Sequence, residues 1–65
     1  MKTYQTIRSE SFCYTSTTRA LAAQLRMMDD TGSSWLAVMG NFPEVLVTTP
    51  ANAARLVKMG YEVMK

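Results

Sequence analysis

The sequence predicts a small α+β domain in which two helices pack on a four-stranded antiparallel sheet. Three observations favour this fold class. The pattern Thr-Thr-x-Ala-x-Ala-Ala-x-Leu-x-x-Met occurs at positions 17–28 and again at 48–59, two apolar runs flank Gly40 and Asn41, and a threonine-proline pair opens the second helical pattern. A repeat in which each copy follows a strand-like run indicates two successive strand-helix-strand units.

The N-terminal fifteen residues predict strand structure. Residues 4–8 and 11–15 are rich in aromatic, β-branched and hydroxyl side chains and are separated by Ser9 and Glu10. This composition favours strands, so we expect either one bent strand or a short hairpin.

A first amphipathic helix is predicted from about Ser16 to Met28. Leu21, Leu25 and Met28 recur at the helical spacing i, i+4 and i+7 and predict its buried face. Ser16 or the threonine after it can cap the free amides at the start. The Asp-Asp-Thr-Gly sequence at 29–32 is expected to end the helix, because paired acids oppose the helix dipole at a C-terminus.

A β-hairpin is predicted over residues 34–48, with its turn at Gly40 and Asn41. Glycine at the first loop position supplies the positive φ that tight hairpin turns need. The second strand would start at Phe42 and run to Thr48, with Pro43 near its beginning because proline cannot donate to a ladder.

Thr49 and Pro50 predict the start of a second helix, since threonine caps the amides and proline at the first position lacks an amide to satisfy. This helix should run to about Met59 and end at Gly60, followed by a short strand over 61–64. The complete order is then βαββαβ, and right-handed crossovers would set both helices on one face. Residues 1–65 are therefore predicted to form one ferredoxin-like two-layer sandwich, with an N-terminal hairpin as a variant.

The predicted hairpin is apolar on both of its faces, whereas a sheet with one solvated face alternates apolar and polar residues. A two-residue turn places Leu36 and Val38 toward the helices together with Val45 and Val47. The opposite face would carry the partner-binding residues Trp35, Met39 and Leu46. We expect either a partner or the folded-back segment 4–7 to cover that face.

Length and composition restrict the ways in which the chain can be stabilised. Sixty-five residues allow one domain with a marginal core, and the single cysteine, Cys13, excludes an internal disulfide. Association with a second copy or with a larger protein is the remaining way to stabilise so small a fold. The chain has no run of about 18 apolar residues and no signal-like N-terminus, so we expect a soluble cytoplasmic protein without membrane contact.

The sequence carries no signature of catalysis, metal binding or phosphate binding, so we expect no enzyme activity and no cofactor. It has no histidine, and its three glycines are isolated. Asp29 and Asp30 are interpreted as a solvated helix end. Cys13 is expected to be a buried strand thiol, with a thiol-dependent activity as the alternative.

The basic residues of the two predicted helices suggest a second kind of surface. If the helices are neighbours, a cationic strip suited to an acidic protein or a phosphate backbone would be formed by Arg19, Arg26, Arg55 and Lys58. No aromatic residue interleaves these positions on the helices, so nucleic-acid bases would have no stacking platform. With a net charge of only +2, a solvated surface is the favoured interpretation.

The sequence therefore favours a non-catalytic protein-binding or regulatory module that acts through an apolar sheet face, with a homodimer preferred to a complex with a larger protein. In general form the chain is similar to small accessory proteins of phages, plasmids and bacterial genomes that bind, and often inhibit, a larger macromolecule. Nucleic-acid binding through the basic strip is the first alternative. A thiol-dependent activity at Cys13 is the second.

Overall fold

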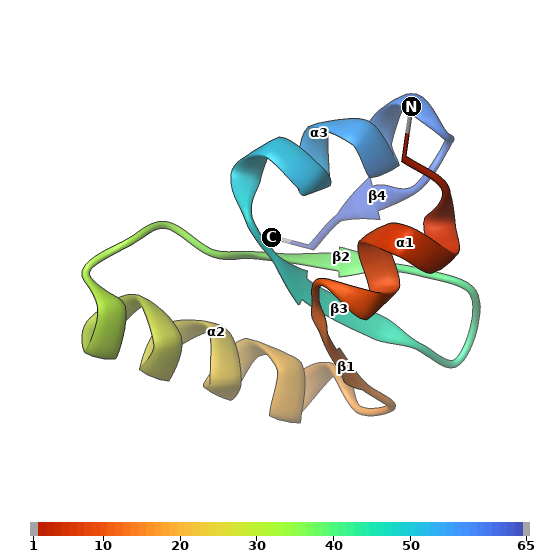
Figure 1. The fold of residues 1–65 in the computed structure, drawn as a ribbon. Coiled ribbons are helices and arrows are strands. Elements are labelled where there is room, and N and C mark those ends of the chain that lie inside the picture. Colours follow the sequence, from red (N-terminus) through yellow and green to blue (C-terminus); the bar gives the residue numbers. More distant parts are fainter. Residues whose placement is uncertain (1, 65) are drawn as a thin grey trace.

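The structure, a computed structural model, describes residues 2–64 as a four-stranded antiparallel sheet with three helices (Figure 1). This confirms the α+β class. In chain order, the elements are α1 (Tyr4–Ser9), β1 (Phe12–Tyr14), α2 (Thr17–Thr31), β2 (Leu36–Met39), β3 (Val45–Thr48), α3 (Pro50–Lys58) and β4 (Glu62–Val63).

The strand order is β1-β3-β2-β4, and every neighbouring pair is antiparallel. Two strand-helix-strand units are interleaved in this sheet: α2 leads from β1 to β2 past β3, and α3 leads from β3 to β4 past β2. Both units step in the same direction across the sheet, but their first strands run in opposite directions. Two crossovers of one hand therefore place α2 and α3 on opposite faces.

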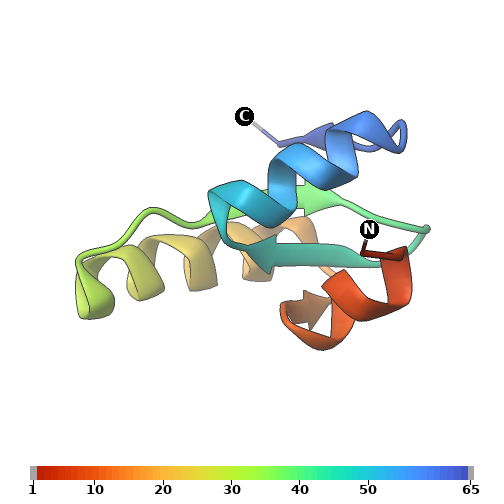
Figure 2. The same ribbon diagram turned by 45° about the horizontal axis from the view of Figure 1, so that its top comes forward.

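Figures 1 and 2 show this arrangement, with α2 on one face of the sheet and α3 and α1 on the other. The ferredoxin-like order with both helices on one face is not confirmed. Both helices would share a face only if the second unit stepped back across the sheet, and β4 instead pairs with β2 at the far edge. The sheet thus lies between two helical layers.

The β2–β3 hairpin is confirmed, but its predicted turn is wrong. Its loop spans residues 40–44, and the Gly40 amide donates to the Glu44 carbonyl at 3.1 Å. The resulting register pairs Val38 with Leu46 and Ala37 with Val47. A two-residue turn would shift this pairing by an odd number of residues. Compared with the predicted hairpin, the longer loop therefore places every β3 side chain on the opposite face of the sheet.

The strand predicted over residues 4–8 is wrong, because the chain forms α1 there. The Thr3 hydroxyl accepts the Thr6 amide at 3.2 Å and caps the helix. Tyr4 and Ile7 then lie on one side, three residues apart, and Ile7 is fully buried. Capping and burial thus outweigh the strand preference of the individual residues. The predicted strand over 11–15 is confirmed as the shorter β1.

The ends of the two longer helices follow the predicted chemistry with one correction. The Ser16 hydroxyl accepts a hydrogen bond from the Arg19 amide at 3.4 Å, and the Thr49 hydroxyl accepts one from the Asn52 amide at 3.3 Å. However, α2 continues through Asp29 and Asp30 to Thr31, and ends where Gly32 adopts a φ of 68°. The glycine therefore terminates this helix, and the acids do not.

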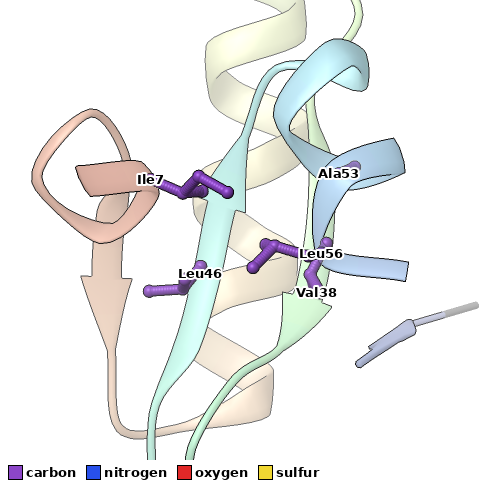
Figure 3. Close-up of a cluster of buried hydrophobic side chains, with 5 residues drawn as sticks. All are labelled: Ile7, Val38, Leu46, Ala53 and Leu56. Carbon is purple, nitrogen blue, oxygen red and sulfur yellow. The ribbon is translucent and has the colours of Figure 1, made fainter. Parts of the chain in front are cut away.

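Each face of the sheet has its own small core. Between the sheet and the helices α1 and α3 lie five buried side chains, which Figure 3 shows: Ile7, Val38, Leu46, Ala53 and Leu56. Between the sheet and α2 lie four others: Ala20, Ala37, Val45 and Val47. The apolar pattern on both faces of the hairpin is therefore accounted for within the chain.

Candidate partner-binding groove

The three predicted partner-binding residues do not share one face. Leu46 is fully buried beneath α1 and α3, whereas Met39 lies on the α2 face with its register partner Val45 and is 46% exposed. Trp35 packs beside the core beneath α2, and its indole nitrogen donates to the Thr31 hydroxyl at 3.0 Å. The change of register in the hairpin is the reason that Leu46 is separated from Met39.

The predicted cationic strip is also divided between two faces, because α2 and α3 lie on opposite sides of the sheet. Arg55 and Lys58 line a hollow of about 250 Å³ together with Lys2 and Met59. The α2 residues Arg19 and Arg26 line a different depression, next to β1.

This second depression is a groove of about 470 Å³ between α2 and β1, and we call it the β1–α2 groove. Its lining combines aromatic, small apolar and cationic side chains from the two elements: Phe12, Tyr14, Arg19, Ala22, Ala23, Arg26 and Met27.

The groove is lined by residues that recur at regular spacings on β1 and on α2. Phe12 and Tyr14 are two apart on β1 and pair with Val47 and Val45, so both face α2. On α2, the four residues at 19, 22, 23 and 26 have the spacing i, i+3, i+4 and i+7 and form one stripe. Phe12 is 53% exposed, which leaves aromatic surface open to a ligand.

Phe12 is held in place by an aromatic contact. Its ring meets the Trp35 ring edge-on, with centroids 6.1 Å apart. Such edge-to-face pairs fix the orientation of a ring as well as contributing to stability. The exposed part of Phe12 is therefore a preformed surface at the side of the groove.

Neither arginine of the β1–α2 groove forms an ion pair within residues 2–64. The ion pairs found there join Lys2 to Glu10 and Arg8 to Glu44, and neither involves Arg19 or Arg26. Both guanidinium groups can therefore bind an external anionic group, and guanidinium donates to carboxylate or phosphate in a bidentate manner.

The groove also lies beside an open edge of the sheet. β1 pairs with β3 on one side, and no other strand within residues 2–64 pairs with its outer side. An unpaired strand edge presents backbone donors and acceptors to an incoming chain.

Cys13 is exposed, which corrects the expectation of a buried thiol. Its sulfur donates to Oε2 of Glu44 at 3.0 Å, and Nε of Arg8 donates to the same oxygen. Partial shielding of the sulfur from water, together with the Glu44 carboxylate, raises the pKa of Cys13 above its ordinary value. A thiol with a raised pKa is a weak nucleophile at neutral pH.

Sequence reasoning missed the aromatic side of the groove. It found no aromatic residue beside Arg19 and Arg26 because it considered only the two helices. The signal was present in the Phe-Cys-Tyr alternation at 12–14, since only two residues separate it from α2. A connection that short makes the helix pack against its own strand.

Other kinds of site find little support within residues 2–64. No cluster of three or more potential metal-ligating residues occurs there, and no helix there has the length and apolar character needed to cross a bilayer. Asp29 and Asp30 are exposed on the last turn of α2. No protein-family model, curated protein or solved structure matches this chain.

Proposed function

We propose that the protein is a non-catalytic binding module that recognises an extended segment of another protein in the β1–α2 groove. The observation that supports this proposal is the position of the groove directly beside the open edge of β1. Extended peptides add to such edges through main-chain hydrogen bonds, while their alternate side chains enter the adjoining groove. The groove volume of about 470 Å³ is sufficient for a few side chains.

The thiol-dependent alternative has weaker support. The Cys13 sulfur interacts with a carboxylate that keeps it protonated, and it lies on the side of β1 opposite the groove-facing Phe12 and Tyr14. A nucleophilic or redox-sensing cysteine requires the reverse influence, a neighbouring cation strong enough to lower the thiol pKa.

A second copy of the chain is one partner that could use the same edge. Two β1 strands can pair antiparallel about a two-fold axis. β1 is only three residues long, however, so this pairing supplies few hydrogen bonds. We therefore favour a foreign segment over the homodimer.

Single-stranded nucleic acid is a second candidate, supported by the arrangement of Arg19 and Arg26 beside Phe12 and Tyr14. Aromatic rings can stack on bases while cations contact the backbone. Two neutralised phosphates predict a weak salt dependence, with a log-log slope of about −1.4 on a single strand. Arg55 and Lys58 lie on the other side of the sheet and cannot extend the same track.

Selection from a displayed library of random linear peptides tests the proposal without assuming a target. Enriched peptides should shift the backbone amide resonances of β1 and α2. Phe12→Ala should weaken their binding about tenfold or more, because roughly half of a phenyl surface becomes buried on binding.

Phe42→Ala is the matched control, since Phe42 is 95% exposed in the hairpin loop and does not line the groove. The melting temperatures of both variants should be recorded, because Phe12 also contacts Trp35. Equal losses of binding in the two variants, or shifts confined to other elements, would contradict the proposed site.

A further inference from the structure

We propose that the β1–α2 groove selects a segment in which two acidic residues four positions apart flank a central apolar residue. This inference rests on the proposed function and specifies the chemistry of its partner. It follows from the order of charge along the groove, the spacing of an extended chain and the lack of ion pairs at Arg19 and Arg26 within residues 2–64.

The helical side of the groove is positive at its two ends and apolar in its middle. Arg19 and Arg26 occupy the ends of the stripe, and Ala22 and Ala23 occupy its centre. At a rise of 1.5 Å per residue, the two arginine Cα atoms lie about 10.5 Å apart along the helix axis. The small alanine side chains leave space above them, and the exposed part of Phe12 faces this space from β1.

An extended segment bound along β1 directs residues i, i+2 and i+4 to the same side. Residues i and i+4 are then about 13 Å apart, which exceeds the axial separation of the arginines by roughly 3 Å. The long arginine side chains can span this difference. A spacing of i to i+2, about 6.7 Å, falls about 4 Å short of the arginine separation and places no side chain between the two acids on the groove side, so it leaves the apolar centre of the groove unfilled.

Charge determines which side chains are favoured at the two ends. Since neither Arg19 nor Arg26 forms an ion pair within residues 2–64, a carboxylate can bind either guanidinium without displacing a partner. A lysine at the same place would be repelled, and an asparagine would form only weaker hydrogen bonds. The central position is expected to be a leucine or a residue of similar size, in contact with Phe12 and the two alanines.

Synthetic peptides can test this pattern on the full chain. Three acetylated and amidated peptides share a central leucine flanked by threonines and carry aspartate, asparagine or lysine at the two outer positions. Calorimetry should show that the aspartate peptide binds about tenfold or more tightly than the asparagine peptide, and that the lysine peptide does not bind.

A charge reversal provides the sharper test. The double variant Arg19→Glu with Arg26→Glu should lose the aspartate peptide and gain the lysine peptide. The matched control is Arg55→Glu with Lys58→Glu, which changes the net charge equally on the opposite side of the sheet and should keep the aspartate preference. A general effect of net charge would alter both double variants alike and would overturn the inference.

The outcomes separate this inference from the function on which it rests. If the asparagine and aspartate peptides bind equally and both shift the amides of β1 and α2, the acidic pattern is refuted but the binding module stands. If none of the three peptides binds, the acidic pattern is also refuted, and the unbiased selection decides the proposed function alone. If a short oligothymidine competes for the groove and binds more tightly than the aspartate peptide, the partner is a nucleic acid and both proposals fail.

Discussion

Replacing Ile7 by alanine should destabilise the whole domain, although Ile7 belongs to a helix of only six residues near the N-terminus. Its side chain has no solvent exposure and lies in the core beneath α1 and α3, beside Leu46 and Leu56 (Figure 3). Truncation to alanine leaves a cavity that this small core can close only in part.

The size of the effect can be estimated from this burial. An Ile→Ala change in a core costs about 2–5 kcal/mol. A domain of 65 residues has a total stability of about 3–10 kcal/mol at typical values per residue. The variant should therefore lose a large part of its stability, and its melting temperature should fall by at least about 8 °C.

Urea denaturation followed by circular dichroism measures this loss, and Leu25→Ala provides the control. Leu25 is an aliphatic residue of similar size on α2, but it is 68% exposed, so its truncation should change stability by no more than about 0.5 kcal/mol. If Ile7→Ala is no more damaging than Leu25→Ala, α1 does not cover the sheet and the reasoning fails.

Three further outcomes are expected. The rate of alkylation of Cys13 should rise with pH, with a midpoint above the ordinary pKa of a cysteine thiol. Glu44→Gln should lower this midpoint because the carboxylate raises the thiol pKa, and Arg8→Gln should raise it because the guanidinium lowers the thiol pKa. Hydrogen bonds from the Cys13 thiol and from Arg8 lower the pKa of Glu44 below the ordinary value for glutamate. The stabilising effect of Glu44 should therefore be present above that ordinary value and be lost as the pH falls through the lower folded-state pKa. Urea denaturation of Glu44→Gln should show a smaller loss of stability in acid than the parent chain shows. Gly40→Ala should lower the melting temperature because an added methyl group meets the Tyr4 hydroxyl, and Tyr4→Phe in the same chain should recover part of the loss.

Each of these outcomes has a matching comparison. Glu62→Gln removes a carboxylate from an exposed site on β4. It should leave the pH profile of Cys13 alkylation and the loss of stability in acid as they are in the parent chain. Tyr4→Phe alone sets the baseline for the double variant, because it removes the hydroxyl that accepts the Asn41 amide at 3.0 Å. Additive losses from Gly40→Ala and Tyr4→Phe would contradict the clash.

Local sequence signals predicted the elements that depend on local chemistry. Thr49 and Pro50 located the start of α3, and Gly32 adopts the left-handed conformation that ends α2. Signals that depend on tertiary packing were less informative. Leu25 and Leu56 occupy the same place in the sequence repeat, yet Leu25 is 68% exposed and Leu56 is fully buried. The repeated pattern therefore does not describe two equivalent helices, because α2 and α3 turn different sides toward the sheet.

The three residues of the predicted apolar sheet face do not form one open surface in the structure, because Leu46 is fully buried and Met39 lies on the other side of the sheet. The interpretation assumed two layers, so an apolar second face required a partner. With α2 and α3 on opposite faces, helices of the chain itself cover both faces of the sheet, and β1 and β4 remain as its edge strands, each with one side that has no partner strand within residues 2–64.

The two edges are not equivalent as binding surfaces. β4 is two residues long, whereas β1 is longer and adjoins a groove with exposed aromatic surface and two arginines that have no ion-pair partner within residues 2–64. An extended partner can gain main-chain hydrogen bonds at either edge, and at the β1 edge the groove adds side-chain contacts that can select its sequence. The interleaved topology thus separates Arg19 and Arg26 from Arg55 and Lys58, and in doing so it places one basic pair beside the longer of the two open edges.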